Sequence, residues 1–140
     1  MPDVAPLAAE LRFVLNRLNR RLRHQQLGDD LTVSQLSVLS VLGREGPLTA
    51  GDLAAKEHVR PPSMTRIIAS LQATGMIQRG ENPADGRQVL VGLTELGRER
   101  AGAEQAARER WLAQQLSGLT IEERDLLRQA AQILNRLAAG

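Results

Sequence analysis

Apolar residues recur along most of the chain at the spacing of helix faces. From Pro6 onward, a stripe of apolar residues recurs at intervals of three or four positions, which is the pattern of an amphipathic helix. These residues are Leu7, Leu11, Val14, Leu15, Leu18 and Leu22. Proline is favoured in a first helical turn, and the run "LGDD" reads as a break. We therefore expect a first helix from Pro6 up to this break.

Capping patterns mark the starts of the next helices. Thr32 and Gln35 form a T-x-x-Q capping box ahead of a helix that "GREGP" should end. Thr49 and Asp52 repeat the cap pattern ahead of the short helix "AGDLAAKEH". After "VRPP", a further helix is predicted from about Pro61 to Thr74, with Gly75 as its left-handed stop.

The period then changes to that of β-strands. "MIQR" and "QVLVGL" are strand-like runs on either side of "GENPADG", which we interpret as a loop. Thr94 should cap a long helix that extends to about Leu116, and Thr120 with Glu123 should cap the last helix. The apolar residues expected on these two helices are Leu96, Ala103, Ala107, Trp111 and Leu112, then Leu126, Leu127, Ala130, Ile133, Leu134 and Leu137.

The order of elements predicts the fold class. Four helices, a hairpin and two helices indicate a mainly α fold with a small β-wing, in which a winged helix-turn-helix core lies between outer helices. We assign one domain, 1–140, with an N-terminal dimerisation helix (1–30), a winged helix-turn-helix lobe (31–94) and C-terminal dimerisation helices (95–140). The outer helices flank the lobe in the sequence and are not part of its winged helix-turn-helix. Their apolar seams are therefore expected to pack against a partner chain.

The helix that begins at Pro61 has two contrasting faces on a helical wheel. Its apolar residues Met64, Ile67, Ile68 and Leu71 cluster on one side, as a core face should. Opposite them are small or polar residues and one long cation: Pro62, Arg66, Ala69 and Ala73, with Ser63 and Thr65 on the flanks. Such a face fits the major groove of DNA, although alanines on a solvated helix are the plainer alternative.

Two features next to this helix favour the DNA-binding interpretation. Pro61 and Pro62 preset the first turn, whose free N–H groups and positive dipole end suit a phosphate, and Arg60 adds charge. At the hairpin tip, "NPADGRQ" places Arg87 beside Gly86, and we expect Asp85 to orient its guanidinium. An arginine on a β-tip suits a narrow, electronegative minor groove.

Composition narrows the remaining function classes. The chain has 140 residues, no cysteine and a net charge of +2, and 17 of its 18 basic residues are arginine. Arginine suits phosphate and base-edge recognition, but a GC-rich genome would favour it as well. The lack of cysteine excludes disulfides and thiolate chemistry, and His24 and His58 are too isolated to indicate a metal site.

No sequence pattern indicates an enzyme, a cofactor or a membrane protein. There is no glycine-rich phosphate loop, pair of catalytic carboxylates or nucleophile with its base. A signal peptide and an apolar run near the roughly 18 residues of a membrane span are also lacking. We therefore expect a cytoplasmic protein that is not an enzyme and has no membrane partner.

The run "LTAGDLAAKEHVRPPSMTRIIASLQATGMIQRGENPADGRQVLVGLTELG" resembles the winged helix-turn-helix of the multiple-antibiotic-resistance regulator (MarR) family. The matching marks are "T-R-I-I-x-x-L" in the recognition helix, "G-M-I-x-R" leading into the wing, "D-G-R" at its tip and "L-T-x-x-G" after it. The outer helices match in number and order, so the resemblance covers nearly the whole chain.

The resemblance implies a homodimeric transcriptional regulator, usually a repressor, with one recognition helix in each half-site of a palindromic operator in double-stranded DNA. The residues it implies for DNA binding are Thr49, Arg60, Pro62, Ser63, Thr65, Arg66, Arg79, Asp85, Gly86 and Arg87. Those implied for the dimer interface are Leu7, Leu11, Val14, Leu18, Leu126, Ala130, Ile133, Leu134 and Leu137. Arg79 would support the wing or touch the DNA backbone, and Thr49 would touch phosphate.

An effector site and one rival function stay open. Many family members sense a small aromatic acid or phenol between the dimerisation helices and the DNA-binding lobe, but this chain has one Phe, one Trp and no Tyr. Phe13, Arg17, His24 and Trp111 are the only candidates for such a pocket, and core, interface or surface roles suit each better. The alternative function is a winged-helix protein-interaction module without specific DNA binding. The basic residues Arg60, Arg66 and Arg87 argue against this alternative, because such a module would have acidic or apolar residues on its groove-facing surface.

Overall fold

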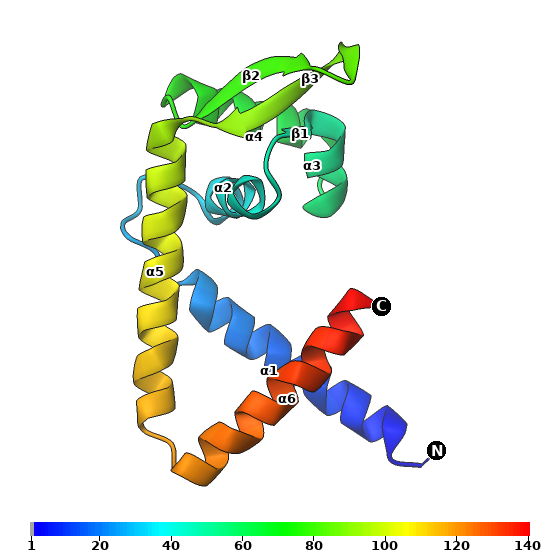
Figure 1. The fold of residues 1–140 in the computed structure, drawn as a ribbon, viewed down its shortest axis with the longest axis vertical. Helices are drawn as coiled ribbons and strands as arrows, with labels where there is room; N and C mark the ends of the chain where they lie inside the picture. The colour runs from blue at the N-terminus through cyan, green and yellow to red at the C-terminus, as the bar shows by residue number, and fades with distance from the viewer. Residues whose placement is uncertain (1) are drawn as a thin grey trace.

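The computed structural model describes residues 2–140. Met1, the first residue of the expected segment 1–30, therefore lies outside the described residues. The elements are α1 (Val4–Arg23), α2 (Val33–Glu45), β1 (Leu48–Thr49), α3 (Ala50–Lys56), α4 (Pro61–Ala73), β2 (Ile77–Asn82), β3 (Asp85–Leu93), α5 (Glu95–Ser117) and α6 (Ile121–Ala139). Helices α2 to α4 and the sheet form a lobe at one end of α5, while α1 and α6 lie beside its other half, where they overlap in this view (Figure 1). The predicted fold class is confirmed.

The core of the molecule lies inside the lobe. Its largest fully buried side chains are Leu39, Leu53, Met64, Ile68, Leu71, Ile77, Val38 and Val91, which come from α2, α3, α4 and the sheet. The apolar face predicted for α4 is the buried one, except that Ile67 is half-buried at the edge of the core. Burial of this kind stabilises a fold by about 25 cal/mol per Å² of apolar surface, so it fixes which face of α4 remains for solvent.

The predicted helix caps are present. Thr32 and Thr120 form complete capping boxes with Gln35 and Glu123. The hydroxyl oxygens of Thr49 and Thr94 accept N–H groups three residues later. Gly75 ends α4 with a φ of 78°, the left-handed conformation that favours glycine.

The wing is longer and more ordered than the sequence suggested. The run "GENPADG" is mostly strand, because Glu81 pairs with Val89 and Asn82 with Asp85, which leaves only Pro83 and Ala84 between the strands. The prediction missed β1, a two-residue strand that pairs with β3 and gives the sheet order β1-β3-β2. This third strand ties the wing to the helix-turn-helix.

The predicted seam of α5 is partly wrong. Leu96 and Ala103 are exposed, while Gly97 and Glu104 are the buried residues of this helix. Gly97 meets the start of the wing so closely that an added Cβ would collide with the Met76 carbonyl oxygen, which also accepts the N–H of Thr94 at 3.0 Å. The first helix also differs, because it begins at Val4 and already ends at Arg23.

Helices α1 and α6 contain no buried residue among those described. Leu7, Val14, Ile133 and Leu137 each expose about half of their surface or more. Long amphipathic helices that leave their apolar faces open within one protomer normally bury them against another. None of the helices between residues 2 and 140 combines the length and the apolar character needed to cross a lipid bilayer.

Candidate nucleic-acid interface

Helix α4 presents its N-terminus and one face to solvent. Arg60 is the extended N-cap residue, and Pro61 and Pro62 occupy the first two helical positions. Neither proline has an N–H group, and the N–H of Met64 donates to the Arg60 carbonyl at 3.1 Å. The expected set of free N–H groups is therefore much reduced, and Ser63 is the only residue of this first turn whose N–H is left to bind an anion.

The exposed face of α4 is narrow and carries one long cation. Pro62, Thr65 and Arg66 are exposed and Ser63 is half-buried. The Thr65 hydroxyl donates to the Pro61 carbonyl at 2.9 Å, so its oxygen keeps its capacity to accept. The small side chains leave room for close approach to another surface, with Arg66 as the group that reaches farthest from the helix.

The wing tip is shaped by side-chain to backbone hydrogen bonds. The Arg87 N–H donates to the Asp85 carboxylate at 3.0 Å, and the Ala84 N–H donates to the Asn82 side-chain oxygen at 2.9 Å. Asp85 therefore fixes the turn through the backbone of Arg87, whereas the sequence interpretation had it holding the guanidinium. Arg87 itself is exposed at the tip of the hairpin, which projects beyond the rest of the lobe (Figure 1).

Two of the other predicted residues make contacts within the lobe. The Arg79 Nε donates to the Gln72 side-chain oxygen at 3.0 Å and so links β2 to the end of α4. The Thr49 hydroxyl oxygen is occupied by the Asp52 N–H at 3.0 Å, and the residue is half-buried. Arg79 thus lies where a wing support should, while Thr49 primarily caps α3.

The sequence interpretation missed the polar contacts that link α2 to α4 and to the end of α3. The Ser37 hydroxyl lies 2.8 and 2.9 Å from the two Glu57 carboxylate oxygens, and the Gln35 amide donates to the Ser70 hydroxyl at 2.8 Å. Between α3 and α4, His58 adopts a φ of 54°. Of these residues, only Gln35 stood out in the sequence, as part of the capping box. The capping box predicts its contact with Thr32 but not its contact with Ser70.

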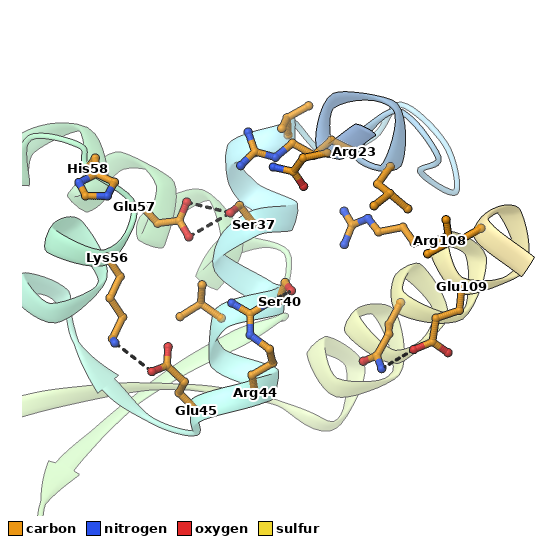
Figure 2. Close-up of a pocket in the computed structure, with 16 residues that line it drawn as sticks. Arg23, Ser37, Ser40, Arg44, Glu45, Lys56, Glu57, His58, Arg108 and Glu109 are labelled. Carbon is orange, nitrogen blue, oxygen red and sulfur yellow. Dashed lines mark hydrogen bonds and ion pairs between the residues drawn. The ribbon is translucent and has the colours of Figure 1, made fainter. Parts of the chain in front are cut away.

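A cleft of about 710 Å³ separates α2 and the end of α3 from α1 and α5. Arg23, Arg44 and Arg108 line it, and Lys56 on its rim is paired with Glu45 at 2.9 Å. Figure 2 shows the Arg108 side chain reaching from α5 toward α2. Its Nε is buried and has no hydrogen-bond partner among residues 2–140.

The four residues considered for an aromatic pocket lie elsewhere. Phe13, Arg17, His24 and Trp111 do not belong to the lining of this cleft. The Arg17 guanidinium lies 5.7 Å from the Phe13 ring, and that of Arg21 lies 4.9 Å from the Trp111 ring. The second pair joins α1 to α5 by a cation–π contact.

Comparison with known proteins gives consistent matches. The family model "MarR family" matches residues 31–89. An uncharacterised HTH-type transcriptional regulator of Mycobacterium bovis is 48% identical over 130 residues, which are 93% of this chain and 91% of that protein. The HTH-type transcriptional repressor MdtR of Bacillus subtilis is 29% identical over 142 residues, covering 99% and 90%. The crystal structure of a cysteine-to-serine mutant of MarR from E. coli superposes with a TM-score of 0.79 at 26% identity, covering 92% of this chain and 96% of that one.

Proposed function

The chain belongs to the MarR family of DNA-binding transcriptional regulators, and from this premise we propose that it is a homodimeric repressor of a palindromic operator. The observation that carries the proposal is the pairing of two exposed arginines on separate elements. Arg66 extends from the small face of α4, and Arg87 extends from the wing tip. A helix and a β-tip that carry such groups fit adjacent major and minor grooves.

The proposal gives each DNA-binding residue a role. Arg66 reads base edges in the major groove, where Thr65 and Ser63 offer hydroxyl groups and Pro62 permits close approach. Arg60 and the Ser63 N–H bind phosphate at the helix N-terminus. Arg87 enters the minor groove from a turn that Asp85 and Gly86 shape. Arg79 supports the wing through Gln72, and Thr49 contributes its helix N-terminus to a backbone contact.

Homodimerisation follows from the outer helices. Members of the family act as dimers, and the interface we propose covers the exposed seams of α1 and α6. Leu11, Ala130 and Leu134 are half-buried within the protomer and would become fully buried. The other proposed residues are exposed: Leu7, Val14, Leu18, Leu126, Ile133 and Leu137.

Selection of bound sequences from a random pool of DNA duplexes tests the core of this proposal. We expect a palindromic consensus whose half-site centres lie about 10 bp apart, because a two-fold dimer presents its recognition helices one DNA turn apart. If two protomers neutralise four phosphates, the affinity for the selected duplex should fall roughly 100-fold as salt rises from about 50 to 200 mM.

The Arg87→Ala variant serves as a parallel arm of the same selection. It should keep the central consensus but lose the preference for A·T steps at its flanks, since it retains α4 and lacks only the minor-groove contact. Unchanged flanks would show that the wing is idle. If the parent protein binds DNA only weakly and selects no consensus sequence, the result would instead favour the alternative function, a winged-helix protein-interaction module.

We further propose that a small anion in the cleft releases the operator. The Arg108 Nε lacks a partner, while the neighbouring carboxylate of Glu109 accepts the Gln105 amide at 3.0 Å. An anion bound by Arg108 between α5 and α2 would shift the lobe relative to the dimerisation helices. The cleft lining contains no aromatic side chain apart from His58, so the ligand is expected to be recognised by charge more than by stacking.

A panel of small aliphatic and aromatic carboxylates, titrated into the complex with the selected duplex, tests this effector proposal. One of them should release the DNA at concentrations up to about 1 mM, and Arg108→Gln should raise the concentration needed at least tenfold. Arg110→Gln, an exposed neighbour on α5, is the matched control and should respond like the parent. A panel without any releasing compound, or an equal response of Arg108→Gln, would contradict the proposal.

A further inference from the structure

Glu104 is the one charged side chain that is buried among the described residues, with 2% of its surface exposed. It lies in the first half of α5, and it belongs neither to the proposed DNA contacts nor to the lining of the cleft. A buried carboxylate is costly unless hydrogen bonds and an opposite charge compensate it. The function proposed above makes no use of this residue.

The compensation comes from the loop between α1 and α2. The Leu27 N–H lies 3.2 and 3.3 Å from the two carboxylate oxygens of Glu104, and Arg100 donates its Nε to the same carboxylate at 3.0 Å. The other two guanidinium nitrogens of Arg100 bind the Asp30 carboxylate at 2.8 and 2.9 Å. These hydrogen bonds lower the pKa of Asp30 and raise that of Arg100. We name the four residues Leu27, Asp30, Arg100 and Glu104 the α5 clamp.

The clamp lies where the DNA-binding lobe meets the outer helices. Two segments of chain connect these regions: α5 itself, and residues 24–32 between α1 and α2 (Figure 1). Leu31, which follows Asp30, is buried in the core of the lobe. The clamp therefore fastens one connection to the other directly next to the lobe.

We propose that the α5 clamp sets the orientation of the lobe relative to the dimerisation helices, and thereby the distance between the two recognition helices of the dimer. Glu104 and Arg100 are on this view positioning residues, which act on DNA through α4 without touching it. The inference rests on the proposed dimeric reading of a palindrome. A lobe attached by α5 alone could rock about one helix, whereas attachment at two points removes that freedom.

The consequence is a strict spacing of half-sites. Adding one base pair between them moves one half-site by about 3.4 Å and rotates it by about 36°, so a rigid dimer must reject the altered spacing. A dimer with rocking lobes would accept several spacings, and it would bind the correct one more weakly because its second contact is no longer preorganised.

Distances between spin labels in the free dimer test the structural half of the inference. The chain has no cysteine, so Ala73→Cys places a single label at the exposed end of α4 in each protomer. The parent should give one narrow distance distribution. Glu104→Gln, and to a smaller extent Asp30→Asn, should broaden it. Asp125→Asn is the matched control, because it removes an exposed carboxylate from a pair with Arg128 within α6 and should leave the width unchanged.

The effect of the clamp on DNA recognition is tested by measuring affinity for duplexes with altered half-site spacing. These measurements use proteins without the label-bearing cysteine. The parent should prefer the selected spacing over one lengthened by 2 bp by at least about tenfold, and Glu104→Gln should reduce this ratio below about threefold. Affinity for a single half-site should stay the same in both, which separates misplacement of the lobe from damage to it.

The outcomes distinguish this inference from the proposed function. If the parent shows strict spacing and the variants retain it with narrow distance distributions, the clamp does not position the lobes and the inference is wrong. If Glu104→Gln lost as much affinity for a single half-site as for the full palindrome, the inference would also be wrong, because the clamp would then merely stabilise the lobe. A parent that gives no label–label distance would refute the dimeric proposal together with the inference, whereas a dimeric parent that binds without regard to spacing would refute the inference alone.

Discussion

Leu134→Asp is expected to turn the dimer into monomers at micromolar concentration. One protomer buries no residue of α6 completely, and Ile133 and Leu137 beside this position are 51% and 69% exposed. If a second copy covers this seam, the substitution places two unpaired carboxylates in an apolar interface, at a cost of several kcal/mol for each. Sedimentation equilibrium measures the result directly.

Asn135→Asp is the control for this substitution. It adds the same charge at the next position, which is exposed and is turned about 100° around α6, away from the rest of the proposed seam. The control should remain dimeric, while Leu134→Asp should also lose at least about 100-fold in affinity for the full palindrome, because each half-site is then bound alone. A Leu134→Asp protein that stays dimeric would show that the interface lies elsewhere.

Gly97→Ala is expected to destabilise the protein by about 3 kcal/mol or more. The new Cβ would meet the Met76 carbonyl oxygen, a backbone atom that cannot rotate away as a side chain would. The same place joins α5 to the wing through the Thr94 cap, whose hydroxyl oxygen accepts the Gly97 N–H at 3.1 Å. Overpacking against backbone therefore forces a shift of the helix or of the strand.

Thermal unfolding at a fixed protomer concentration measures this effect, for which we expect a fall of roughly 10 °C. Gly102→Ala is a matched control on the same helix, because nothing lies within 4 Å of the Cβ it would add. It should stabilise the protein slightly, by up to about 1 kcal/mol, since alanine is the better helix former. Equal stability of Gly97→Ala and the parent would show that α5 can move away from Met76 at little cost.

The features that could be predicted from the sequence are those that a few neighbouring residues determine. Thr32 with Gln35, Thr120 with Glu123, and Gly75 act over one helical turn, so the caps and the stop could be placed before the structure was known. The buried face of α4 followed in the same way from the periodicity of its own apolar residues. The exposed residues proposed for DNA binding therefore also followed from the sequence.

The features that could not be predicted depend on distant partners. The burial of Gly97 follows from Met76 across the wing, and that of Glu104 follows from Leu27, 77 residues away. Periodicity favoured Leu96 and Ala103 on α5, because an apolar pattern cannot anticipate a buried carboxylate that another segment satisfies. The strands reached into "GENPADG" because pairing across the hairpin overrides the turn preference of single residues.

The positions of α1 and α6 on either side of the lobe in the chain have a consequence for the order of events during biosynthesis. Residues 4–23 leave the ribosome before the lobe and residues 121–139 after it, yet both belong to the surface that is proposed to join two protomers. The lobe between them contains the buried core and can fold while the chain is still growing. Assembly must wait until α6 has also been made, so each subunit arrives with its DNA-reading parts already formed. Until a second copy with both helices binds, the leucines of α1 remain exposed to solvent and accessible to chaperones.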